Sequence, residues 1–256
     1  MRILAVGDLV GESGVRKLKE MLPKIKKEEN IDFVITNGEN SAGGMGITEK
    51  NFRDILDAGT NVITMGNHTW GKKDIFKFID SPQLLRPANY PRGVVGKGIG
   101  IYECKDKKIA VINLIGRVDI NILSENPFII AKEMVDEIKD KVDIIIMDFH
   151  AEATAEKIAM ARFLDGKVTA IYGTHTHVQT ADEQIFTGGT AYITDIGMTG
   201  PKNSVIGMDI EASIKRFETT LPEKYKLAEG ECIFNAVIFE IDDKTDKVTE
   251  IKRIYC

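Results

Sequence analysis

Short apolar runs alternate with amphipathic stretches along the first part of this chain, and this alternation limits the folds open to it most strongly. The runs "RILAVG" (residues 2–7) and "DFVITNG" (32–38) read as buried strands. Between them, apolar residues recur on one helical face: Val15, Leu18, Leu22 and Ile25. A strand, a helix and a strand at this spacing predict βαβ units with mainly parallel pairing.

The same reading extends over the rest of the sequence. A helix is expected from Thr48 to Gly59, a strand over 61–66 and a helical segment over 73–80. Further on, the pattern predicts a hairpin at 100–116, helices at 126–140 and 153–164, and strands at 142–149, 167–173, 190–197, 232–242 and 247–255. Roughly ten strands and five or six helices suit two sheets packed face to face with helices outside.

The predicted fold class is therefore α/β, a four-layer α-β-β-α sandwich of two mixed sheets. The sequence has no repeat, no low-complexity segment and no long linker, so we expect a single domain over residues 1–256.

The charge and the cysteine content indicate which binding partners and which cellular compartment to expect. The net charge of −5 argues against a surface for non-specific nucleic-acid or membrane binding. Cys104, Cys232 and Cys256 have neither disulfide nor metal-ligand spacing, which favours a reducing compartment. No run approaches the roughly 18 apolar residues of a membrane span, and the N-terminus lacks a signal-peptide pattern. We expect a cytoplasmic protein.

Polar residues gather where five predicted strands end. These positions include all four histidines of the chain, and they are Asp8, Glu39, Asn40, Asn67, His68, His150, His175 and His177. Taken alone, such a residue is more often a helix cap, a turn residue or a hydrogen-bonded loop residue than a ligand. Because sites in α/β sheets lie beyond the carboxyl ends of strands, the joint occurrence favours one shared site.

His175 and His177 stand two apart in "GTHTH". If the segment is extended, both point to one side, with Cα atoms about 7 Å apart. That spacing suits one metal ion or two neighbouring ions. Imidazole, carboxylate and amide ligands suit iron, manganese or zinc, whereas a closed structural zinc site would call for cysteine.

Several motifs resemble a known signature. "GD" (7–8), "NGEN" (37–40), "GNH" (66–68), His150 and "GTHTH" (173–177) are similar, in this order, to the calcineurin-like metallophosphoesterase blocks. The longer stretches "NGENSAGGMGIT", "GNHTW", "RPANYP", "DFHAEATAEK", "GTHTHVQTAD" and "TDIGMTGP" resemble the YmdB-type branch of bacterial cyclic-nucleotide phosphodiesterases. This likeness covers nearly the whole chain.

Two departures from the wider superfamily match that branch. Val10 stands where the first block usually has His, and Glu39 stands where the bridging ligand is usually Asp. Asn40, beside the bridge, is the natural substitute for the lost imidazole. Gly71 occupies a position where we would expect an Asp as a helix cap.

The resemblance implies two metal ions, with iron or manganese ahead of zinc. It assigns Asp8, Glu39, Asn40 and His177 to the first ion, and Glu39, Asn67, His150 and His175 to the second, with Glu39 bridging. His68 would protonate the leaving oxygen while a metal-bound hydroxide attacks; the alternative for His68 is a further ligand or an orienting residue. Two divalent ions, two carboxylates and a hydroxide leave one net positive charge, which complements a singly charged diester.

The expected function is hydrolysis of 2′,3′-cyclic nucleotides, and of 3′,5′-cyclic nucleotides as an extension. A metal-dependent phosphomonoesterase for nucleotides or phosphoproteins and a non-catalytic metal-binding regulator are the alternatives. The partner is a small phosphodiester, with no stable nucleic-acid or membrane binding, and a homo-oligomer is left open. Further candidates for substrate contact are the loop 41–46, Arg117, and the rings of Trp70 and Tyr90.

Overall fold

The computed structural model describes residues 1–224 and 226–256, which form two six-stranded sheets and a smaller third sheet. The first sheet runs in the order β15 (Val248–Tyr255), β14 (Asn235–Ile241), β1 (Arg2–Val6), β3 (Phe33–Asn37), β4 (Val62–Thr64) and β5 (Leu84–Leu85). The second runs β10 (Gln184–Ile185), β11 (Ala191–Ile193), β9 (Ala170–Thr174), β8 (Ile144–His150), β7 (Lys107–Ile115) and β6 (Ile99–Cys104). The third is β13 (Cys232–Ile233), β12 (Met198–Pro201) and β2 (Asp8–Leu9).

Parallel pairs form the middle of both large sheets. β1, β3, β4 and β5 are parallel, as are β11, β9, β8 and β7, whereas β14, β15, β10 and β6 join antiparallel. The sheets are mixed, as predicted.

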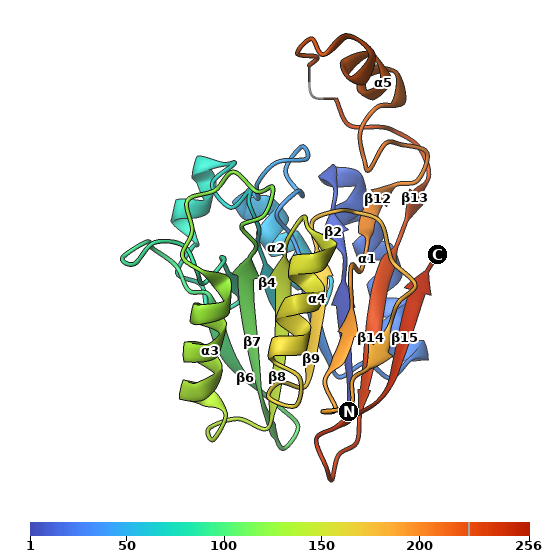
Figure 1. The fold of residues 1–256 in the computed structure, drawn as a ribbon. Coiled ribbons are helices and arrows are strands. Elements are labelled where there is room, and N and C mark those ends of the chain that lie inside the picture. The colour runs from blue at the N-terminus through green and yellow to red at the C-terminus, as the bar shows by residue number, and fades with distance from the viewer. Residues whose placement is uncertain (225) are drawn as a thin grey trace.

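Successive side chains along a strand point to opposite faces of the sheet, and this alternation separates the layers of the sandwich. Ile3 and Ala5 of β1 pack between the two sheets, while Leu4 and Val6 face the other way, toward helix packing. The outer faces are covered by α1 (Gly11–Glu28) and α2 (Glu49–Asp57) on the first sheet, and by α3 (Pro127–Ile138) and α4 (Thr154–Phe163) on the second. Strands buried on both faces explain the continuous apolar runs in the sequence. The four-layer prediction is confirmed (Figure 1).

Several local features differ from the predictions, and the short strands β2, β5, β10 and β12 were not expected. The helix expected over 73–80 is a short 3-10 helix, η1 (Lys73–Lys77). Ile75 is its only buried residue, so little packing stabilises a longer helix. The strand expected over 232–242 is broken at Phe234 between β13 and β14. An unpredicted helix, α5 (Ile210–Thr219), lies on an arm away from the sheets, and none of its residues is buried (Figure 1).

The carboxyl ends of β1, β3, β4, β8 and β9 meet at one end of the sandwich, at the top of Figure 1. Polar residues that follow these strands are thereby brought together from both sheets. Within the described chain, none of the helices has the length and apolarity needed to cross a bilayer.

Candidate metal centre

The structure brings all eight predicted site residues together at this end of the sandwich. Asp8 begins β2 directly after β1, Glu39 and Asn40 follow β3, Asn67 and His68 follow β4, His150 is the last residue of β8, and His175 and His177 follow β9. Short, buried parallel strands from two sheets thus supply one constellation.

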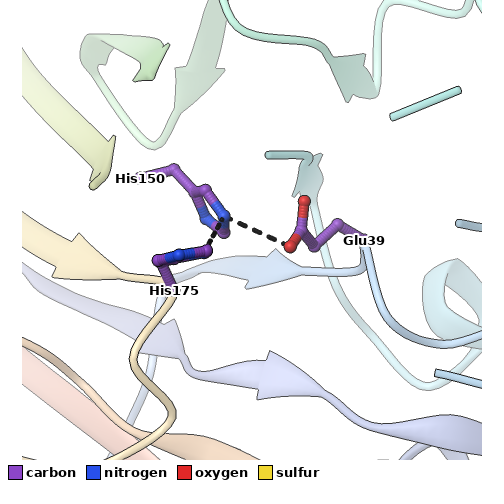
Figure 2. A group of neighbouring side chains, drawn as sticks. All are labelled: Glu39, His150 and His175. Carbon is purple, nitrogen blue, oxygen red and sulfur yellow. Dashed lines mark hydrogen bonds and ion pairs between the residues drawn. The ribbon is translucent and has the colours of Figure 1, made fainter. Parts of the chain in front are cut away.

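One group of side chains converges on His150. Its Nε2 atom lies 3.2 Å from Glu39 Oε1, 2.8 Å from Asn67 Oδ1 and 3.0 Å from His175 Nδ1. Figure 2 shows the Glu39, His150 and His175 side chains turned toward one another. One ring nitrogen carries at most one hydrogen, yet three potential acceptors face it. A cation is the natural partner for so many lone pairs, so this donor set fits a metal ion.

A second group lies on the other side of Glu39. His177 Nε2 is 3.8 Å from Asp8 Oδ1 and accepts a hydrogen bond of 3.1 Å from Asn40 Nδ2, which also donates to Glu39 Oε1 at 3.3 Å. Asp8 is fully buried, and its Oδ1 atom has no hydrogen-bond partner among the described residues. A buried carboxylate oxygen without a donor is costly, and a cation between Asp8 and His177 would satisfy it.

Each ligand-like imidazole has its other nitrogen engaged away from the centre. His150 Nδ1 donates to Thr174 Oγ1 (2.9 Å), which donates to the buried Asp148 Oδ1 (2.7 Å). His177 Nδ1 donates to the carbonyl oxygen of Ile206 (2.9 Å), and His175 Nε2 lies 3.0 Å from Glu152 Oε2. Such contacts fix ring orientation and leave the facing nitrogen free to bind a metal.

These supporting residues were not predicted from the sequence. A signal existed for Asp148, which precedes His150 by two in the same strand and so shares its side of the sheet. No sequence signal marks the Ile206 carbonyl, because backbone oxygens are common to every residue.

The predicted conformation of the two-histidine segment was wrong. β9 ends at Thr174, and His175 and His177 have φ angles of +100° and +66°, so neither is extended. Non-glycine residues in this region are strained by about 1–3 kcal/mol each. The two rings reach different groups, His175 toward His150 and His177 toward Asn40 and Asp8.

Glu39 and His150 form a buried ion pair. Burial raises the pKa of Glu39, but the charge and hydrogen bond of His150 outweigh it and bring that pKa to about 2. Burial lowers the pKa of His150, but the Glu39 carboxylate outweighs it and brings that pKa to about 9. Burial raises the pKa of Asp8 to about 6, and burial with the charge of His150 lowers that of His175 to about 3.

His68 lies at the edge of the centre. Its backbone N–H donates to Glu39 Oε2 (2.9 Å), and its ring Nδ1 donates to Asn40 Oδ1 (2.6 Å). Burial lowers its pKa, partly opposed by Glu39. The glycine of "GNH" has no room for a side chain, since a Cβ at Gly66 would collide with the ring of His150.

The aromatic candidates differ in exposure. Tyr90 is buried and donates to the carbonyl oxygen of Gly66 (3.0 Å), so it is a packed residue and not a free ring for a nucleobase. Trp70 is partly exposed and stacks on Phe76. Gly71 packs against the loop 41–46, where a Cβ would lie 2.9 Å from Gly46 N, which explains why no Asp stands there.

Known proteins resemble this chain over its whole length. A family model described as "YmdB-like protein" matches residues 4–254. A Bacillus subtilis (strain 168) protein named 2′,3′-cyclic-nucleotide 2′-phosphodiesterase is 50% identical over 99% of this chain and 96% of its own length. The crystal structure of a phosphatase from Mycoplasma pneumoniae is 39% identical, covers 100% of this chain and 93% of its own, and has a TM-score of 0.95. The crystal structure of a hypothetical protein from Thermus thermophilus is 35% identical, covers 100% of this chain and 99% of its own, and has a TM-score of 0.94.

Metal affinity should rise with pH, because a cation must displace the proton on His150. With the pKa of His150 at about 9, the site holds that proton at pH 7, and each unit from pH 7 toward 9 should strengthen binding about tenfold. Above pH 9 the gain should stop, and below about pH 6 the loss should steepen as Asp8 takes a proton. Chelator competition on the metal-free protein measures this.

Glu39→Gln is the matched control for that titration. Removing the carboxylate that raises the pKa of His150 should move the rise to lower pH as well as weaken binding. An affinity that stays flat from pH 7 to 9 in the unaltered protein would contradict the ion-pair description.

Proposed function

This chain belongs to the YmdB-like protein family, and on that premise we propose that it hydrolyses cyclic nucleotides, 2′,3′-cyclic monophosphates first, at a centre of two metal ions. More broadly, it is an enzyme that hydrolyses phosphoesters, with the metallophosphoesterase fold. The family implies divalent metal ions, and Glu39, His150 and His175 form a cluster that could hold one.

The observation that carries the proposal is the number of side-chain nitrogen and oxygen atoms that face one another around Glu39. The facing atoms come from only two carboxylates, Asp8 and Glu39, and otherwise from amides and from imidazoles, which carry no charge once a cation has displaced the proton of His150. Among the described residues, the hydrogen bonds and ion pairs of these side chains involve no Lys or Arg. A site with few fixed charges suits a singly charged diester better than a dianionic monoester.

The division of ligands is part of the proposal. Asp8, Glu39, Asn40 and His177 would hold one ion, and Glu39, Asn67, His150 and His175 the other. Its support is that Glu39 Oε1 faces both groups, 3.2 Å from His150 Nε2 and 3.3 Å from Asn40 Nδ2. Asn40 would bind an ion through its Oδ1 atom, which in the structure accepts from His68 Nδ1. Mixed nitrogen and oxygen ligands favour iron or manganese, and zinc is also compatible with them.

Two such ions, when bound, supply Lewis acidity toward the phosphoryl oxygens and lower the pKa of water at the site. The chain itself supplies the proton for the leaving oxygen. Because His68 Nδ1 is held by Asn40 Oδ1, its Nε2 is the position from which a proton would pass to the substrate. Burial lowers the pKa of His68, so its protonated form is a stronger acid, and a smaller fraction of the protein carries that proton at neutral pH.

We also propose that the enzyme is a single domain and is located in the cytoplasm. One domain over residues 1–256 is supported by a hydrophobic cluster between the two large sheets, whose side chains come from both of them. A cytoplasmic location is supported by three free cysteines without a disulfide partner.

Comparing a diester with its monoesters tests the substrate class. Metal-loaded protein should hydrolyse 2′,3′-cyclic AMP with a kcat/KM at least roughly tenfold above that for 2′-AMP or 3′-AMP, because the centre complements one negative charge. Faster turnover of the monoesters would make it a phosphomonoesterase. Metal-loaded protein that hydrolyses none of the three would favour a regulator that binds metal without catalysis.

His68→Gln tests the proton donor. We expect kcat on 2′,3′-cyclic AMP to fall by about 10²–10⁴-fold with metal content unchanged. On bis-p-nitrophenyl phosphate the loss should be much smaller, because p-nitrophenolate leaves without protonation. Equal losses on both substrates, together with lost metal, would instead make His68 a ligand.

A further inference from the structure

A buried ion pair beside the centre has no role in the proposed reaction. Lys157 of α4 and Asp195, which follows β11, are 1% and 0% exposed, and Lys157 Nζ lies 2.7 Å from Asp195 Oδ2. Taking two charges out of water is so costly that apolar replacements of buried pairs are often neutral or stabilising. Stability alone therefore gives no reason for a charged pair at this place.

The other contacts of Asp195 lead to the centre. Its Oδ2 accepts hydrogen bonds from both donors of Thr176, the backbone N–H (3.2 Å) and Oγ1 (2.8 Å). Its Oδ1 accepts from Gly197 N at 2.8 Å. Lys157, Thr176 and Gly197 together satisfy both carboxylate oxygens, so the group is fixed from three directions.

Thr176 is the residue between the two histidines. His175 and His177 both have left-handed φ angles, and their rings diverge to different groups of the centre. Two hydrogen bonds from one residue to one carboxylate fix the middle of this strained tripeptide. A free tripeptide would relax to ordinary angles and turn at least one ring away.

The ion pair of Lys157 and Asp195 is tightly packed against the end of β9. A Cβ at Gly173, two residues before His175, would collide with the carbonyl oxygen of Thr194 and lie 2.8 Å from Lys157 Cδ. The end of β9 therefore lies directly against the Lys157 stem and against the residue before Asp195. Any displacement of the pair would reach the histidine segment through these contacts.

We propose that Asp195, held by Lys157, is a positioning residue that fixes Thr176 and so directs His175 and His177 into the two halves of the metal centre. The inference rests on the proposed metal site. Asp195 and Lys157 are not among the proposed ligands; the pair acts through the backbone that carries two of them.

Two substitutions test this by metal binding instead of turnover. Asp195→Asn removes the charge, and Thr176→Val removes the hydroxyl donor with little change of shape. Both should weaken metal binding by about 10–100-fold, the usual effect of losing an orienting partner. The dissociation constants come from chelator competition, with the Tm of each metal-free variant measured alongside. Thr176→Ser, which keeps the hydroxyl, should retain wild-type affinity.

Asp242→Asn is the matched control. Asp242, in the turn between β14 and β15, accepts from the N–H and Oγ1 of Thr245 (both 2.9 Å), the same pattern on a residue without contact to the histidine segment. It should lower the Tm and leave metal affinity unchanged. Wild-type affinity in Thr176→Val, or an equal affinity loss in Asp242→Asn, would overturn the proposal.

The positioning role of Asp195 and the proposed function can be refuted independently of each other. If Asp195→Asn does not fold, Thr176→Val and Thr176→Ser decide the matter, since they change only a partly exposed loop residue. Wild-type protein that binds metal but opens no phosphodiester would refute the proposed function and leave the positioning role intact. Tight metal binding in every variant would refute the positioning role and leave the function intact.

Discussion

The structure depends on an excess of hydrogen-bond acceptors at one buried point. Three atoms able to accept face His150 Nε2, which can carry one hydrogen, and Asp8 Oδ1 has no donor within the described chain. In a protein interior, unmatched lone pairs are unfavourable unless a cation neutralises them. The ion pair of Glu39 and His150 satisfies part of this demand with a proton, and the rest of the arrangement is suited to metal ions.

The fold explains how so many hydrogen-bond acceptors come together at one point. Parallel strands from two sheets end at the same place, so five separate segments each need to contribute only one or two residues. Tight packing then restricts those residues: Gly66 has no room for a side chain beside His150, and Gly173 has none beside Lys157. The backbone strain of His175 and His177 is held by contacts outside the centre, chiefly the Ile206 carbonyl and the Asp195 carboxylate.

Much of this was predictable from the sequence, for identifiable reasons. Buried parallel strands are continuous apolar runs, so the layers could be read from patterns such as "RILAVG", and strand ends located the eight residues. The pattern could not show the direction in which the chain continues after a strand ends. Whether the residues after Thr174 stay extended depends on partners distant in the sequence, and these partners, Asp195 and Ile206, were not identified. Helix α5 was missed because it buries no residue, and so lacks the packing that the apolar pattern reports.

The central claim is that Glu39 and the residues around it bind two cations in one chain. Elemental analysis of protein loaded with manganese or iron and freed of excess metal by gel filtration tests it most directly, with Glu39→Gln as the comparison. We predict two ions per chain in the unaltered protein and one or none in Glu39→Gln, whose neutral amide is a poor bridge. A protein that retains no ion, or a Glu39→Gln variant that retains both, would contradict it.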